Sequence, residues 1–148
     1  MSLIRALQVL TLSAFLAVSF GGAAEQPAQP EVDKLVILSS DSLQTQGMAL
    51  VLATALEARG NSIHVLLCDQ AGQLAIKDYQ PDSLAPRDMT PKDLLMGLMK
   101  KGTAVQVCAL FLPNSEYTEA DLIDGVTVAK PPEIAGLMDQ PETDVLTY

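Results

Sequence analysis

The chain has 148 residues, of which 49% are hydrophobic and 18% are charged, a composition that suits one globular domain with a single core. Its 18 acidic residues outnumber its 9 basic residues and give a formal net charge of −9 at pH 7. A surface this negative repels the phosphates of nucleic acid and the headgroups of anionic membranes, which argues against both as partners.

The first 24 residues have the pattern of a secretory signal peptide. A short segment with Arg5 as its only charge precedes an apolar run over residues 6–20, and small residues follow up to Ala24. The apolar run is shorter than the roughly 20 residues that a membrane-spanning helix needs. We therefore expect cleavage near Ala24, export to the periplasm or another extracytoplasmic site, and no membrane association after removal of the signal. A retained N-terminal anchor is the alternative.

Residues 25–33 are predicted to form a flexible lead-in, and residues 34–148 a single folded domain. The lead-in contains Pro27 and Pro30 among Gln and Glu residues, a composition that cannot bury enough apolar surface to become ordered. From residue 34 onward, patterns typical of strands alternate with patterns typical of helices, without an internal repeat or a low-complexity segment.

The first half of the domain predicts a β-α-β unit. The apolar runs at residues 35–38 and 63–67 are typical of strands buried on both faces. Between them, the turn at residues 39–42 suits a helix cap, and a helix is predicted over residues 43–59 with Gly60 at its end. Such units have right-handed crossovers and form parallel sheets.

The second half continues the alternation after a long surface loop, which is predicted over residues 70–89 and in which residues 73–76 could form a helical turn. The later elements are a helix from Pro91 to the residues before Gly102, a strand over 104–107 that leads into Cys108, a short helix over 118–125, a strand over 126–129, a helix over 131–138 and a strand over 144–148. This order predicts an α/β fold, a three-layer α/β/α sandwich with a mostly parallel five-stranded sheet.

Cys68 and Cys108 each follow the carboxyl end of a predicted strand, the edge at which open α/β sheets bind ligands. The sequence leaves three arrangements open: a structural disulfide, a redox pair in which one thiol resolves a persulfide on the other, or two thiols too far apart to bond. A disulfide needs Cα atoms within about 7 Å and a demanding geometry, so we favour the third arrangement.

The segments around Cys108 carry a resemblance to a known family. Lys-Lys-Gly at residues 100–102 leads into Val-Gln-Val-Cys at residues 105–108, and Leu-Ile-Asp-Gly-Val at residues 122–126 leads into Pro-Glu at residues 132–133. With the alternation of strands and helices, these motifs resemble the DsrE/DsrF-like family over nearly the whole domain. The resemblance implies a three-layer α/β/α fold, assembly as a trimer or hexamer, and a sulfur-relay role in which Cys108 holds sulfane sulfur as a persulfide.

Two functions remain as hypotheses. The first is an exported carrier that takes sulfane sulfur on Cys108 from a donor protein or a small sulfur compound and passes it on, more a carrier than a turnover enzyme. Many relatives continue after the cysteine with small residues and an Arg-Gly pair, whereas residues 109–114 here are mostly apolar and lack a basic residue. Because an apolar setting makes a thiol less reactive, the second hypothesis is an oligomeric small-ligand-binding module with structural cysteines.

The other candidate residues have simpler interpretations. Ser39, Ser40 and Asp41 are accessory candidates for an anion in the same crevice, although capping is the commoner role of such a turn. His64 is the only histidine, and its place inside a strand favours a structural or solvent-facing role. The chain has neither a zinc ligand set nor a glycine-rich phosphate loop, so no metal or cofactor is expected.

Overall fold

The structure is a computed structural model that describes residues 31–148. The predicted signal peptide and residues 25–30 of the predicted lead-in lie outside the described residues. Among residues 31–148, no helix has the length and apolar character needed to cross a membrane.

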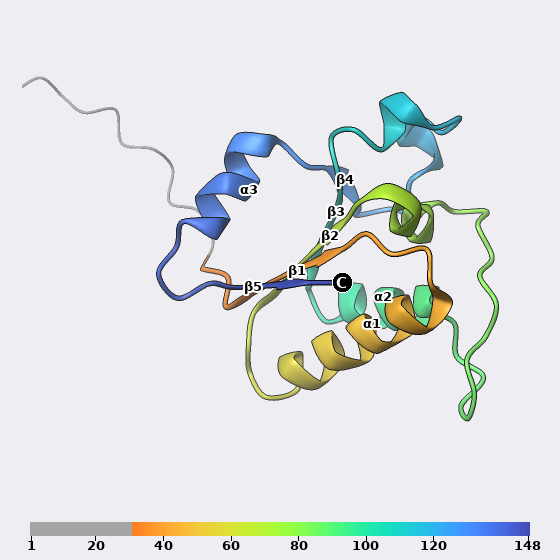
Figure 1. The fold of residues 1–148 in the computed structure, drawn as a ribbon, viewed down its shortest axis with the longest axis horizontal. Helices are drawn as coiled ribbons and strands as arrows, with labels where there is room; N and C mark the ends of the chain where they lie inside the picture. Colours follow the sequence, from red (N-terminus) through yellow and green to blue (C-terminus); the bar gives the residue numbers. More distant parts are fainter. Residues whose placement is uncertain (1–30) are drawn as a thin grey trace, which may run out of the picture.

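Five strands form one sheet in the order β4-β3-β2-β1-β5 (Figure 1). The strands are β1 (Lys34–Leu38), β2 (Ile63–Leu67), β3 (Ala104–Val107), β4 (Thr127–Val128) and β5 (Asp144–Thr147). Every neighbouring pair is parallel, so the carboxyl ends of all five strands meet at one edge. The predicted five-stranded sheet is confirmed, and it is parallel throughout.

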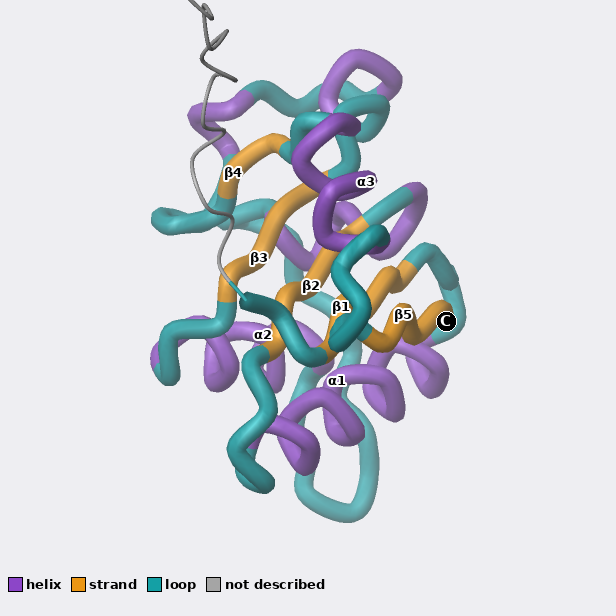
Figure 2. Tube along the Cα trace, turned by 90° about the vertical axis from the view of Figure 1, so that its left-hand side faces the viewer, coloured by secondary structure: helices purple, strands orange, loops and turns teal. Residues whose placement is uncertain are grey.

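Helices cover both faces of the sheet. Helices α1 (Leu43–Glu57) and α2 (Pro91–Lys100) lie side by side on one face, and α3 (Pro131–Met138) is the one α-helix of residues 31–148 on the other (Figures 1 and 2). This arrangement confirms the three-layer α/β/α sandwich.

Alternate strand positions supply two separate cores, as the two-residue period of a strand requires. Val36, Val65 and Val107 belong to the larger core with α1 and α2. Leu35 and Leu66 belong to the smaller core, where they meet two side chains of α3, Ile134 and Leu137. The face that carries α3 is therefore the more thinly covered one.

The predicted helix over residues 118–125 is wrong in extent. Only one 3-10 turn forms there, η3 (Glu119–Asp121), and Thr118 and Asp121 make the capping box that the sequence indicates. Leu122 instead forms an antiparallel bridge with Ile76, and the Ile123 N–H donates to the Ala75 carbonyl at 2.8 Å. These partners draw the backbone away from helical geometry directly after the first turn.

The predicted loop over residues 70–89 begins with a 3-10 helix, η1 (Asp69–Ala75), which starts earlier than the helical turn considered over residues 73–76. Its Leu74 side chain is fully buried in the larger core. Beyond η1, the ammonium group of Lys92 is buried and donates to three carbonyl oxygens, those of Ile76, Lys77 and Tyr79, each at 2.7 Å. The first part of this segment is thus fixed to α2.

Two residues assigned to the lead-in are bound to the domain. Val32 is buried in the smaller core, and its carbonyl accepts a hydrogen bond from the Thr143 hydroxyl. The Asp33 carboxylate accepts from the Ser62 N–H, and the Asp33 carbonyl accepts from the Asp144 N–H at 2.9 Å. The packed part of the chain therefore starts before Lys34.

Candidate functional site

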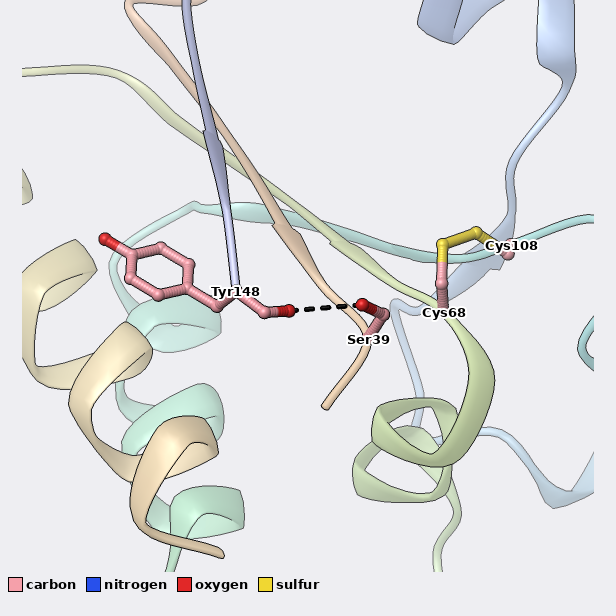
Figure 3. Close-up of a disulfide and its surroundings, with 4 residues drawn as sticks. All are labelled: Ser39, Cys68, Cys108 and Tyr148. Atoms are coloured by element: carbon pink, nitrogen blue, oxygen red, sulfur yellow. Dashed lines mark hydrogen bonds between the residues drawn. A yellow bond between two sulfur atoms is a disulfide. The ribbon is translucent and has the colours of Figure 1, made fainter. Parts of the chain in front are cut away.

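Cys68 and Cys108 are joined by a disulfide, with their Cα atoms 5.0 Å apart (Figure 3). Each cysteine continues the hydrogen bonding of the sheet one residue beyond its strand: the Cys68 N–H donates to the Leu38 carbonyl and the Cys108 N–H to the Leu67 carbonyl, both at 2.8 Å. The expectation that the two thiols lie too far apart to bond is therefore wrong.

The strand order explains this correction. β2 and β3 are neighbours, and Leu67 at the end of β2 pairs with Val107 at the end of β3. The next position on each strand is a cysteine, and both cysteines pack on the side of the smaller core. Neighbouring parallel strands lie about 4.8 Å apart, so the sheet itself brings the two thiols within bonding range.

A cavity of about 840 Å³ opens beside the disulfide at the carboxyl edge of the sheet, and both cysteines line it. Its other walls come from η1, from the segment after Cys108, and from α3. The lining side chains include Asp69, Gln70 and Gln73 from η1, Leu110, Phe111 and Tyr117 from the segment after Cys108, and Ile134 and Met138 from α3. The disulfide is thus accessible to a molecule that enters the cavity.

A close contact between η1 and the segment after Cys108 shapes this cavity. The ring of Phe111 stacks on Tyr117 with the ring centroids 6.2 Å apart, and its edge lies against Gly72. A Cβ atom at Gly72 would lie 2.4 Å from Phe111 Cδ2, so only glycine leaves room for the ring in this position. The position of Phe111 in the cavity wall therefore depends on Gly72, which belongs to η1.

Two charged side chains of residues 31–148 line the cavity, Asp69 and Glu116, and both are acidic. No Lys, Arg or His is found among the described residues that line it. A thiolate formed here would have no cationic side chain in the lining to stabilise it, and these two carboxylates would weaken the binding of an anionic ligand. Across residues 31–148, no cluster of three or more His, Cys, Asp or Glu side chains is arranged to hold a metal ion.

Ser39, Ser40 and Asp41 do not line the cavity. The Ser39 hydroxyl donates to the Tyr148 carbonyl at 3.2 Å, as Figure 3 shows, which ties the end of β1 to the end of β5. The Ser40 hydroxyl accepts from the Ser42 N–H at 3.1 Å, within the cap of α1. Asp41 is exposed. An accessory role for these three residues stays a prediction.

His64 is buried on the α3 face of the sheet, and its Nε2 lies 3.0 Å from Oε1 of Gln106. Because that oxygen can only accept, Nε2 is the protonated nitrogen of the neutral ring. Burial lowers the pKa of His64 from its usual 6.5, and the hydrogen bond to Gln106 opposes this only in part. His64 does not line the cavity and has the structural environment that its place in the strand favours.

Several lining residues were not singled out from the sequence. Asp69 directly follows Cys68, and Phe111 stands three residues after Cys108, but only proximity to the cysteines could have indicated them. Asp69 adopts a left-handed backbone conformation, with φ of 47°, which glycine, asparagine and aspartate tolerate best. This turn carries the chain from β2 into the wall formed by η1.

No family model and no curated protein matches the chain. The chain is similar to the crystal structure of the YchN protein from E. coli, which has a DsrE/DsrF-like fold. The TM-score is 0.65 at 20% sequence identity, and the match covers 79% of this chain and 100% of that chain. The structure of the protein of unknown function MTH1491 from Methanobacterium thermoautotrophicum gives a TM-score of 0.63 at 15% identity, covering 79% of this chain and 99% of that chain. Likeness at such low identity concerns the fold alone. The chain therefore has the DsrE-like α/β fold that the motifs around Cys108 imply.

Proposed function

We propose that the protein is a sulfur carrier that holds sulfane sulfur as a persulfide on Cys108, with Cys68 as the thiol that resolves it. The observation that carries the proposal is the pair of cysteines within bonding distance on the wall of an open cavity. The DsrE-like fold supports it, because the resemblance in the sequence links this fold to sulfur relay through a cysteine at the position of Cys108.

Loading requires the reduced pair. Two electrons and two protons from an external dithiol convert the Cys68–Cys108 disulfide into two thiols. The Cys108 thiolate then attacks the outer sulfur of a donor persulfide, the sulfur–sulfur bond of the donor breaks, and the donor leaves as a thiolate. Cys108 now carries one additional sulfur atom. An acceptor thiolate removes it by the same exchange and leaves Cys108 as a thiolate.

Cys68 provides a second way to discharge the persulfide. With its Cα atom 5.0 Å from that of Cys108, its thiolate can attack the inner sulfur of the Cys108 persulfide. The Cys68–Cys108 bond forms and hydrosulfide leaves, so the sulfane sulfur departs as sulfide and the pair returns to the disulfide. Without an acceptor, the carrier therefore ends in the oxidised state.

The alternative function, a small-ligand-binding module, has one observation in its favour. The cavity is within the range of about 300 to 1,000 Å³ that is typical of small-molecule sites, and its lining is mainly apolar. In that case the disulfide would be structural and would stabilise the fold by about 2–4 kcal/mol through the constraint on the unfolded chain. Neither cysteine would then take up sulfur.

A homo-oligomer, a trimer or a hexamer, is part of the proposal. Helix α1 exposes Met48, Val51 and Leu52 on its outer face, with exposed fractions of 53%, 46% and 37%. No charged residue precedes Glu57 in this helix. A helix that is apolar on all sides is usually buried on all sides, which supports a second copy of the chain as the cover of this face.

Export to the periplasm or another extracytoplasmic compartment completes the proposal. The signal-peptide pattern of the first 24 residues supports it. A disulfide between the two cysteines also suits an oxidising compartment, where exposed thiols do not persist in reduced form without a reducing system.

Intact-mass spectrometry of a defined set of proteins tests the carrier role. The wild type is reduced, freed of reductant, exposed to an inorganic polysulfide and digested for peptide mapping. A carrier gains sulfur on the Cys108 peptide, and reductant removes it. Cys108→Ser is expected to lose this gain with its fold intact, and the unreduced wild type is expected to show none. Absence of sulfur on Cys108 in the reduced Cys68→Ser variant, which lacks the resolving thiol, would favour the binding module.

Cys68→Ser separates loading from resolution. This variant cannot form the internal disulfide, so its Cys108 persulfide should persist for much longer than that of the wild type, and it should release no sulfide. Equal lifetimes in the two proteins would remove Cys68 from the proposed cycle.

A further inference from the structure

We infer that the Cys68–Cys108 disulfide is opened by a polypeptide dithiol whose cysteines lie in an apolar segment that is neutral or basic, and not by glutathione or another anionic small thiol. The inference rests on the proposed function, because it names the reductant that returns the cysteine pair to the state that accepts sulfur. It is argued from the size, the lining and the charge of the cavity.

The cavity is large enough to accept a polypeptide segment. The space of about 840 Å³ far exceeds what a sulfide, a sulfite or another small sulfur anion can fill. A thiol that occupies only a corner of such a cavity gains few contacts and is poorly oriented for attack on the disulfide. A segment with several side chains gains both contacts and orientation.

The apolar lining specifies the character of that segment. Leu110 has 74% of its surface exposed and Met138 has 48%, and both line the cavity beside the disulfide. Ile134 and Phe111, which are both buried, also contribute to the apolar lining. An apolar partner that covers these side chains binds more favourably, by about 25 cal/mol for each Å² of apolar surface removed from water.

The charge of the lining selects against anions. Asp69 and Glu116 are exposed, acidic and unopposed by any basic side chain among the described residues of the lining. Lys130, which precedes the lining residue Pro131, forms an ion pair with Glu133 at 3.0 Å. Glutathione has a net negative charge at neutral pH and would be repelled, whereas a basic segment would be attracted.

The exchange needs no further reactant. One thiolate of the partner attacks the Cys108 sulfur, the Cys68–Cys108 bond breaks, and Cys68 leaves as a thiolate that takes up a proton. The second thiolate of the partner attacks the partner's own sulfur in the mixed disulfide, and Cys108 leaves. Two electrons pass from the partner dithiol to the cysteine pair, and the partner leaves as a disulfide.

Two synthetic peptides of equal length test the inference on the oxidised, full mature protein. Both contain two cysteines separated by two residues and flanked by leucine and phenylalanine; the charged positions are lysine in one peptide and glutamate in the other. Acid quenching and mass spectrometry give the rate constant for reduction of the Cys68–Cys108 bond. We expect the lysine peptide to react about tenfold faster than the glutamate peptide, and faster than glutathione.

Two double variants locate the effect. Asp69→Asn with Glu116→Gln removes both charges and retains a residue that tolerates the left-handed backbone at position 69. It should bring the two peptides to similar rates, as should high salt. Asp82→Asn with Glu142→Gln makes the same change of charge at exposed residues that do not line the cavity, and it should preserve the difference.

The apolar requirement has its own variant. Leu110→Ser changes an exposed side chain, so the fold should persist. The variant should be reduced severalfold more slowly by both peptides, whereas its rate of reduction by glutathione should be unchanged. Equal rates for all thiols, or a faster reaction with glutathione, would overturn the inference. If this happens while Cys108 still loads sulfur, the inference fails alone; if peptide selectivity persists without loading, the proposed carrier function fails alone.

Discussion

At the scale of single residues, the site depends on the register in which β2 and β3 pair. Leu67 and Val107 are register partners, so the cysteines that follow them stand side by side. A shift of one residue in either strand would turn one thiol to the opposite face of the sheet. The candidate site is therefore specified by register as much as by the two cysteines.

Gly72 is the residue whose substitution tests the shape of the cavity. In Gly72→Ala, the added methyl group would meet the ring of Phe111, which must move or force η1 to move. We expect a loss of about 1–3 kcal/mol in the free energy of unfolding, as is usual for overpacking. Urea denaturation of the oxidised protein measures it.

Gly97→Ala is the matched control for this substitution. Gly97 lies in α2, and nothing stands within 4 Å of a Cβ atom added there. Because alanine is the better helix former, this variant should be as stable as the wild type or more stable by up to about 1 kcal/mol. Equal losses in both variants would show that the contact with Phe111 is not the cause.

His64 predicts a dependence of stability on pH. Its pKa is held below 6.5 by burial in the fold, whereas the unfolded chain has the ordinary value. The unfolded state thus binds more protons as the pH falls through 6.5, and the free energy of unfolding should decrease there; above 6.5 the residue should contribute no slope.

His64→Gln should remove this part of the slope while the titrating carboxylates remain common to both proteins. Denaturation curves recorded between about pH 8 and about pH 5 give the comparison. Parallel pH profiles for the wild type and the variant would contradict the assignment of a neutral, buried His64.

At the scale of elements, the wall of the cavity depends on the connection between η1 and α2. Lys92 places a positive charge against three carbonyl oxygens beyond the end of η1. Desolvation lowers the pKa of Lys92, and the charges of Asp78 and Asp93 oppose this change. A charged group with three short hydrogen bonds fixes a segment that otherwise has little regular structure.

Lys92→Met keeps the length of the side chain and removes its donors. The three carbonyl groups would lose their common partner, and we expect a loss of about 3 kcal/mol in the free energy of unfolding. Hydrogen exchange should increase first in residues 76–79. Lys100→Met, an exposed position on the same helix, is the control and should change stability by less than about 0.5 kcal/mol. An unaltered segment in Lys92→Met would contradict this role.

The elements that the sequence predicts correctly are those with local signals. Apolar runs mark β1, β2 and β3, and Gly60 follows the end of α1 with φ of 92°. The errors occur where distant residues decide the backbone. Residues 118–125 carry a capping box, but the bridge between Leu122 and Ile76 overrides it, and no local pattern reveals that pairing.

At the scale of the whole molecule, the order of the strands could not be predicted from the sequence. The strand order depends on how the crossover connections pack on the sheet. It decides whether Cys68 and Cys108 lie on adjacent strands or far apart along the same edge. The resemblance to a sulfur-relay family indicated Cys108 but gave no partner for it. The cavity, its acidic lining and the disulfide all emerge only from the assembled fold.

The exposed apolar face of α1 predicts self-association. Met48→Lys places a charge in the middle of this face and should shift the protein to a smaller species, measured by sedimentation velocity. Gln80→Lys adds the same charge at an exposed residue outside α1 and should leave the assembly unchanged. A wild type that sediments as a monomer would contradict the proposed interface.

The most direct test of the carrier proposal is the mass of the Cys108 peptide after the reduced mature protein has met a polysulfide. The proposal predicts a gain of sulfur on Cys108 that reductant removes, that is absent from the unreduced protein, and that lasts longer in Cys68→Ser. A reduced Cys68→Ser variant whose Cys108 stays unmodified under these conditions would contradict it and leave the wild-type pair as a structural disulfide beside a binding cavity.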